Sequence, residues 1–200
     1  MFDFKNHSIT DIDKGSINVM TVARLVPKKG HEYMIKALPA IIKKYPQVQY
    51  TIVGSGPLKK RLQKTVRKLR LTRNVRFVNA IPHHHLKVIL EQAHIFVLPS
   101  VVDFQGDSES CPDVLKEAIA LGVPVISTDH AGIPELVEHG VTGLLVQEKN
   151  VNALSNEVIY AIEHQEQCRK MAKKAYQAVL NDFDLKTQNN KLEQLLVQLL

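Results

Sequence analysis

Two carboxylates, Glu109 and Glu117, lie eight positions apart around the expected start of a helix. Residues 108–112 form a small polar turn, and an apolar helical pattern follows over 113–121. The first N–H groups of such a helix are unpaired and lie at the positive end of its dipole, which suits a phosphate. A carboxylate further along the helix can accept hydrogen bonds from vicinal hydroxyls such as those of a ribose. The stretch therefore predicts a site for the diphosphate and sugar of an activated donor.

Two cations, Arg24 and Lys29, lie five positions apart in a loop that follows the first expected strand. A guanidinium binds phosphate oxygens through two parallel hydrogen bonds, and an ammonium acts as a point charge. Together they suit a diphosphate, whose negative charge grows as it leaves. The spacing alone leaves open a plain basic loop and, for the two glutamates, a pair of surface acids.

Short β-rich runs alternate with helical patterns along the chain. Strands are expected at Ile17–Ala23, Val48–Val53, Asn74–Asn79, Ile95–Leu98, Val123–Ser127 and Thr142–Val146. A helix to about Tyr45 contains Pro39, which is expected to kink or end it, and another opens at Pro82. The last fifty residues are helical, in about three pieces. Alternation with short loops predicts an α/β domain: a doubly wound, Rossmann-like, mostly parallel six-stranded sheet.

The loops that carry polar and glycine residues all follow strands. They are Arg24–Gly30, Gly54–Pro57, Ser100–Pro112 and Asp129–Gly132. Ligands of such sheets bind beyond the carboxyl ends of the strands, so we expect these loops to meet at one edge. Gly54 and Gly56 allow a tight turn, but without a third glycine they are a poor dinucleotide fingerprint.

The composition is that of a globular protein, with 44% hydrophobic and 23% charged residues among 200. Two cysteines are too few for a disulfide scaffold, which favours a reducing compartment. Neither a signal-peptide pattern nor an apolar run of about 20 residues is present. The expected location is therefore the cytoplasm.

Positive charge is concentrated in residues 57–76, which hold nine basic residues and no acid, from Lys59 to Arg76. The rest of the chain has 17 basic and 20 acidic residues. This patch could be a solvated helix face, because Leu62, Val66 and Leu69 fall on the opposite side. It could also contact an anionic membrane at the inner face of the cell membrane. Nucleic acid is the least favoured partner, and none is expected.

The segment Glu109-x7-Glu117, followed by Ala118-x-Ala120-x-Gly122-x-Pro124-Val125-Ile126, resembles the E-x7-E signature of retaining GT-B glycosyltransferases of family 4 (group 1). Further segments resemble the family in order: Ala23-Arg24-Leu25-Val26-Pro27-x-Lys29-Gly30, Val53-Gly54-x-Gly56-Pro57, Val97-Leu98-Pro99-Ser100, Ala131-Gly132-Ile133-Pro134-Glu135 and Gly140-x-Thr142-Gly143-Leu144-Leu145-Val146. The resemblance covers about residues 17–180.

The resemblance implies a role for each matched residue. Arg24 and Lys29 would bind the diphosphate, and Glu109 would lie beside the transferred sugar; these three are the catalytic candidates. Glu117 would hold the ribose. The remaining donor-binding candidates are Gly54, Gly56, Asn79, Ala80 and Ile81 near the base, Ser110, Cys111, Pro112 and Asp113 near the sugar, and Val114 and Leu115, whose N–H groups would meet the distal phosphate. No metal or other cofactor is expected.

The implied activity is transfer of a glycosyl group from a nucleotide sugar to an acceptor hydroxyl with retention, in bacterial polysaccharide or surface-glycan synthesis. The chain would be the C-terminal, donor-binding half of a GT-B fold, inactive alone. Its parts would be a tail (1–16), the nucleotide-sugar-binding domain (17–182) and a helix (183–200) that packs on an absent N-terminal domain. A saccharide or lipid-linked saccharide acceptor would bind through that other half. The alternatives are a non-catalytic nucleotide-sugar-binding module and a Rossmann domain that binds membrane or nucleic acid through the basic patch.

Overall fold

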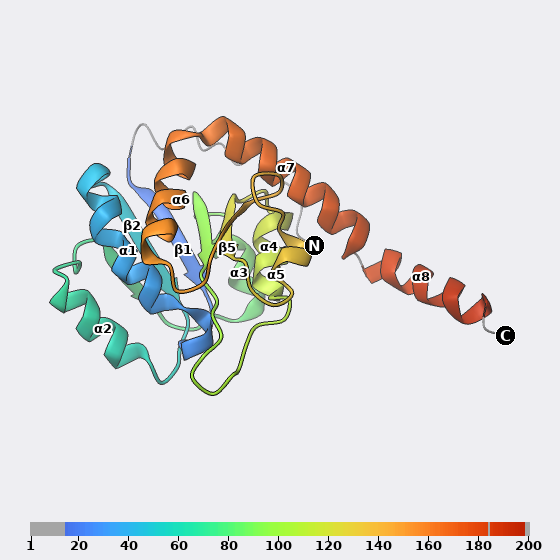
Figure 1. Ribbon diagram of the computed structural model, residues 1–200, viewed down its shortest axis with the longest axis horizontal. Helices are drawn as coiled ribbons and strands as arrows, with labels where there is room; N and C mark the ends of the chain where they lie inside the picture. Colours follow the sequence, from blue (N-terminus) through green and yellow to red (C-terminus); the bar gives the residue numbers. More distant parts are fainter. Residues whose placement is uncertain (1–14, 184, 199–200) are drawn as a thin grey trace.

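The computed structural model describes residues 15–183 and 185–198. Its centre is a six-stranded sheet with the order β3-β2-β1-β4-β5-β6 (Figure 1). The strands are β1 (Ile17–Val22), β2 (Val48–Val53), β3 (Val75–Val78), β4 (Ile95–Leu98), β5 (Val125–Thr128) and β6 (Leu144–Val146). Each neighbouring pair is parallel. The predicted doubly wound sheet is confirmed.

Helices cover both faces of the sheet. They are α1 (His31–Lys44), α2 (Lys59–Lys68), α3 (Leu86–Leu90), α4 (Asp113–Ala120), α5 (Ile133–Leu136), α6 (Val151–Glu163), α7 (Gln165–Asp182) and α8 (Leu185–Gln198), with short 3-10 turns η2 (Pro27–Lys29) and η3 (His83–His85). Buried side chains of α1, α2 and α6 form one core cluster with the sheet. Those of α3, α4 and α5 form the other, and α7 contributes to both. Successive strand residues face opposite clusters: Val19 lies in the first and Met20 in the second.

The strand order reverses between β1 and β4, because the chain builds β2 and β3 on one side of β1 and then returns to the other. The loops after β1 and β4 therefore border the crevice in which ligands of such sheets bind. Gly30 brings the two loops together. A Cβ added at Gly30 would lie 1.7 Å from the Pro99 carbonyl oxygen, and its φ of +64° is left-handed, so glycine is required here.

Two expectations about helices are corrected. Pro39 does not end α1, which continues to Lys44; the proline is exposed, while Leu38 and Ile41 hold the helix to the core. The helix expected from Pro82 is instead a 3-10 turn, His83–His85, followed by one short α-helix, Leu86–Leu90.

The helix α8 continues from α7 and extends away from the sheet (Figure 1). Its leucines Leu192, Leu195 and Leu196 are 53–58% exposed. Packing of residues 183–200 on another domain remains a prediction. Within the predicted tail, residues 1–14 lie outside the described residues, as do 184 and 199–200 at the C-terminal end. In the part of the chain that the structure describes, none of the helices has the length and apolar character needed to cross a membrane.

Candidate active site at the carboxyl edge of the sheet

The loop after β1 presents two cations from a braced backbone. The buried ring of His31 donates from Nε2 to the Arg24 carbonyl oxygen, 3.0 Å away. Burial lowers the pKa of His31 to about 4, so the ring is neutral near pH 7 and donates without adding charge. The Arg24 side chain is exposed, and Lys29 ends η2 with its side chain 14% exposed. The loop thus holds one cation outward and one sheltered.

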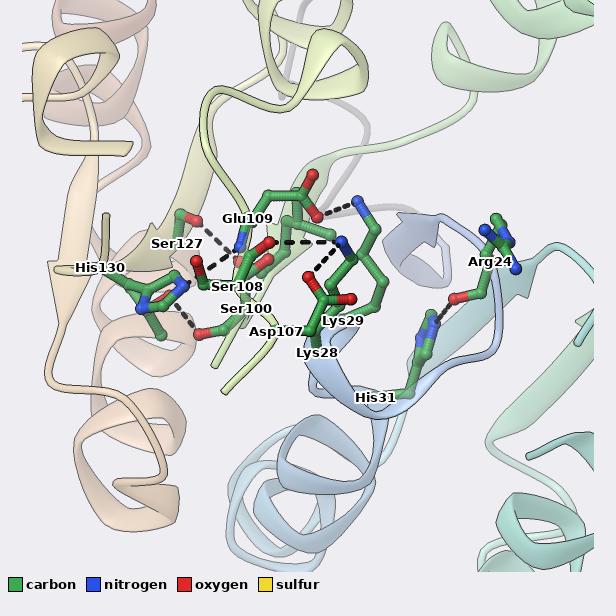
Figure 2. Close-up of polar contacts among 12 residues, drawn as sticks. Arg24, Lys28, Lys29, His31, Ser100, Asp107, Ser108, Glu109, Ser127 and His130 are labelled. Atoms are coloured by element: carbon green, nitrogen blue, oxygen red, sulfur yellow. Dashed lines mark hydrogen bonds and ion pairs between the residues drawn. The ribbon is translucent and has the colours of Figure 1, made fainter. Parts of the chain in front are cut away.

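Lys29 and Glu109 form an ion pair across the crevice (Figure 2). Their side chains are 14% and 15% exposed, so the pair is largely shielded from water. The sequence pointed to each residue separately, but the contact joins segments 80 positions apart. A shielded pair of this kind keeps its geometry, because neither charge can lose its partner without a desolvation cost.

The loop that carries Glu109 is held from the side of β1. Lys28 Nζ donates to Asp107 Oδ1 at 3.0 Å and to the Ser108 carbonyl oxygen at 3.2 Å. The Val101 N–H donates to the Lys28 carbonyl oxygen at 2.9 Å. Lys28 therefore fixes the beginning and the end of this loop, a role that the sequence did not reveal.

The same loop is held from the opposite side by the turn after β5. The Glu109 N–H donates to His130 Nε2 at 3.4 Å, and His130 Nδ1 lies 3.6 Å from Glu148 Oε2. Glu148 Oε2 also accepts from the Val102 N–H at 2.7 Å. His130 is buried, and its neighbour Ala131 has a positive φ of 47°, an uncommon conformation for a residue with a side chain. The turn after β5 thus holds the backbone of Glu109 through His130.

Glu117 lies in the second turn of α4, and its side chain is 17% exposed. Its Oε1 is 2.7 Å from His83 Nε2, which comes from η3 beyond the end of β3. His83 was expected only to begin a helix. Its position after a strand, at the edge predicted to bind ligands, was the signal available in the sequence.

A cavity of about 260 Å³ opens between the ends of β1 and β2 and the segment after β3. Its walls are mainly apolar and include Gly54, Ala80 and Ile81, together with Arg24 and His83. A mainly apolar cavity beside a guanidinium suits an aromatic base joined to an anionic group.

Two residues predicted near a base do not line this cavity. Gly56 instead lies against the backbone of Leu25, where an added Cβ would be 2.6 Å from the carbonyl oxygen. The Asn79 side chain accepts a hydrogen bond from Lys59 Nζ at 2.6 Å.

The remaining predicted donor-binding residues surround the start of α4. Pro112 is the N-cap residue, and exposed Asp113 pairs with Lys116 at 2.7 Å. The Leu115 N–H donates to the Pro112 carbonyl oxygen at 3.0 Å, so this predicted phosphate donor already has a partner within the chain. Val114 is partly buried, and Ser110 is exposed. Burial raises the pKa of the Cys111 thiol, which argues against a nucleophilic thiolate. Among residues 15–183 and 185–198, no group of three or more His, Cys, Asp or Glu side chains could hold a metal ion.

Known proteins resemble this chain in sequence and structure. It is 35% identical over 181 residues to WcaL of Escherichia coli, named as a glycosyltransferase of colanic acid biosynthesis, and the match covers 90% of this chain and 45% of WcaL. It is 37% identical over 150 residues to the amylovoran biosynthesis glycosyltransferase AmsK of Erwinia amylovora, covering 75% of this chain and 37% of AmsK. The chain thus spans less than half the length of these curated relatives.

The crystal structure of Anabaena HepE in complex with UDP superimposes with a TM-score of 0.83 at 26% identity, covering 98% of this chain and 56% of HepE. Residues 3–178 match the family described as "Glycosyl transferases group 1". Together with the doubly wound sheet and the charged crevice at its carboxyl edge, this match shows that the chain belongs to the group 1 glycosyltransferases.

Proposed function

We propose that this chain is the donor-binding, C-terminal half of a retaining GT-B glycosyltransferase of family 4. The complete enzyme would transfer a glycosyl group from a nucleotide sugar to an acceptor hydroxyl in bacterial polysaccharide or surface-glycan synthesis. The observation that carries the proposal is the shielded Lys29–Glu109 pair at the crevice, with Arg24 in the same loop as Lys29. Glu117 lies on α4, the helix that follows the Glu109 loop. The relatives in colanic acid and amylovoran biosynthesis support the wider role.

The nucleotide would lie across the carboxyl ends of β1 and β4. Its base would occupy the apolar cavity beside Gly54 and Ile81, and its ribose hydroxyls would bind Glu117. The diphosphate would then meet Arg24 and Lys29 of the loop after β1. The crystal structure of HepE is in complex with UDP, which supports a nucleotide as the ligand.

The cations would act mainly on the leaving group. As the glycosyl bond breaks, negative charge grows on the diphosphate, and fixed positive groups stabilise that charge more than they stabilise the substrate. Lys29 is held against Glu109 before a ligand binds, so it is already oriented. The leaving phosphate would take the acceptor proton on the same face of the sugar, which retains the configuration and needs no metal.

Glu109 would lie beside the transferred sugar. Its carboxylate is fixed by Lys29 and its backbone by His130, so it can face the developing positive charge on the sugar ring without rearranging. The acceptor would approach from the half of the enzyme that this chain lacks.

The exposed face of α2 would place the enzyme at the inner face of the cell membrane. Leu62 and Val66 of α2 are buried, whereas Lys60, Lys64 and Arg67 are exposed. Sedimentation with vesicles of anionic phosphatidylglycerol tests this: binding should fall with added salt and with Lys60→Glu plus Lys64→Glu. Binding that ignores these changes would exclude α2 as the contact.

Calorimetric titration of the chain with UDP-, GDP- and ADP-sugars tests the main proposal. We expect the UDP series to bind, because the structural neighbour HepE is in complex with UDP. Lys29→Ala should weaken that binding, while the matched exposed change Lys43→Ala should not. A chain that binds none of these nucleotides would contradict the proposed function. Loss of transfer by the complete enzyme on addition of EDTA would contradict the metal-free mechanism.

A further inference from the structure

A second cavity, of about 310 Å³, opens between the start of α1, the start of α2 and the loop after β4. It shares no lining residue with the apolar cavity beside Gly54. Its walls include Glu32 and Tyr33 of α1, Arg61 of α2, Asp103 and Phe104 of the loop, and Lys149. None of these side chains has a part in the proposed binding of the nucleotide.

The polar groups of this cavity carry both signs of charge. Arg61 Nη2 lies 3.2 Å from Glu32 Oε2, and 70% of the Arg61 side chain is exposed, so most of its donors still face solvent. Asp103 and Lys149 add one further group of each sign. Such a balanced set favours neither an anion nor a cation. It does offer paired donors and acceptors to hydroxyl groups.

The aromatic rings of Tyr33 and Phe104 also line the cavity, and the Phe104 ring is exposed to solvent. Phe104 is 83% exposed at the tip of its loop. The tip is ordered around Asp103, whose Oδ1 accepts from the N–H groups of Gln105 at 2.8 Å and Asp107 at 3.0 Å. A single exposed phenyl ring is common on protein surfaces, but this one lies at the wall of a cavity, where it offers an apolar face to a ligand.

We propose that this cavity binds an uncharged saccharide unit that is distinct from the donor sugar. Hydroxyl groups would pair with Glu32 and Arg61, and the C–H face of the ring would pack on Phe104 and Tyr33. The inference rests on the proposed function, because it identifies this unit as a remote part of the acceptor glycan. Phe104 and Glu109 lie in the same loop after β4, which Lys28 and Glu148 hold in place. A saccharide bound at Phe104 would therefore contact the loop that also carries Glu109.

Saturation-transfer NMR on the chain tests this site, with methyl α-glucoside, α-mannoside, α-galactoside and α-fucoside as probes and UDP at saturation. At least one glycoside should receive saturation from the protein with UDP present. Phe104→Ala and Arg61→Ala should each weaken its binding about tenfold, as expected for loss of one good contact. Val88→Ala, an exposed apolar side chain elsewhere, and Arg67→Ala, a cation of α2 outside the cavity, are the matched controls and should change nothing.

The inference is overturned if no glycoside binds, if UDP displaces the glycoside, or if Phe104→Ala and Arg61→Ala bind it as wild type does. The last result would mean that the saccharide binds elsewhere. Binding of UDP is measured in the same samples and separates the two proposals. A chain that binds UDP but no glycoside loses only this site; a chain that binds the glycoside but no nucleotide loses the proposed function and keeps the site.

Discussion

Glu109 and Glu117 are almost equally buried, at 15% and 17% exposed, but their partners differ. Glu109 lies in a loop and pairs with Lys29, which is 14% exposed. Glu117 lies on a helix and pairs with His83, which is 74% exposed. A loop residue needs contacts from other segments to hold its backbone, whereas a helix holds the backbone of its own residues. We therefore propose that Glu109 presents a fixed charge and that Glu117 exchanges its exposed partner for a ligand hydroxyl.

Glu109→Gln should have the largest effect on catalysis, because it removes the negative charge of the side chain and keeps its size and shape. In the complete enzyme we expect kcat to fall about 10²- to 10³-fold, as when one preorganised electrostatic group is removed. UDP affinity should hold or rise, because Lys29 no longer shares its charge with a carboxylate. Steady-state kinetics measures kcat, and titration measures UDP affinity. A loss of UDP affinity as large as the loss of kcat would show that Glu109 acts in binding and not in catalysis.

His130→Phe tests whether the loop contacts set the position of Glu109. The phenyl ring keeps a flat aromatic side chain but accepts no hydrogen bond from the Glu109 N–H. Small displacements at a reacting centre cost about ten- to 100-fold in kcat. The KM for the donor should change little, because the diphosphate contacts remain.

His130→Gln supplies an amide oxygen and should restore part of the lost rate. Hydrogen exchange at the Glu109 amide should rise in His130→Phe and fall back in His130→Gln. A rate unchanged in His130→Phe would show that Lys29 alone holds the carboxylate.

The sequence predicted the sheet well, because hydrophobic runs and turns are local signals. Six strands and their shared carboxyl edge follow from alternation of elements. Residue type and spacing made Arg24, Lys29, Glu109 and Glu117 candidates, and the resemblance to the family motifs gave them their expected roles. Which of them touch was not predictable, since the Lys29–Glu109 contact depends on how two loops cross at β1 and β4.

His83 and His130 were missed as site residues for the same reason. Each reaches its glutamate across a long sequence separation, 34 and 21 positions. A histidine in a loop carries no periodic signal of its contacts. Pro39 does not end α1, because it lies on the exposed side of the helix and the buried residues around it keep the helix in place; the expected kink stays a prediction.

Glu117→Gln should have a moderate effect that appears in binding. Loss of a charged acceptor for ribose hydroxyls should weaken UDP about tenfold, or about 1.4 kcal/mol. The same change should not weaken 2′-deoxy-UDP further, if the 2′-hydroxyl is the group that Glu117 holds. Isothermal titration of UDP and 2′-deoxy-UDP to the wild type and to Glu117→Gln measures the four affinities that this comparison needs. Equal losses for the two nucleotides would remove Glu117 from the 2′-hydroxyl.

His83→Ala should have the smallest effect. A contact made by a largely exposed side chain contributes about 0–1 kcal/mol, so UDP affinity should stay within about threefold of wild type. The exposed neighbour change His84→Ala is the matched control. A loss as large as that of Glu117→Gln would show that His83 itself contacts the nucleotide and would erase the contrast between the two pairs.

The most direct test of the account compares Lys29→Ala with wild type for UDP, UMP and uridine. The account places Lys29 at the diphosphate, so the change should weaken UDP strongly, UMP less and uridine not at all. Titration calorimetry on the chain gives the three affinities for each protein. An equal loss for uridine and UDP would contradict the account, because Lys29 would then support the fold of the site rather than the phosphates.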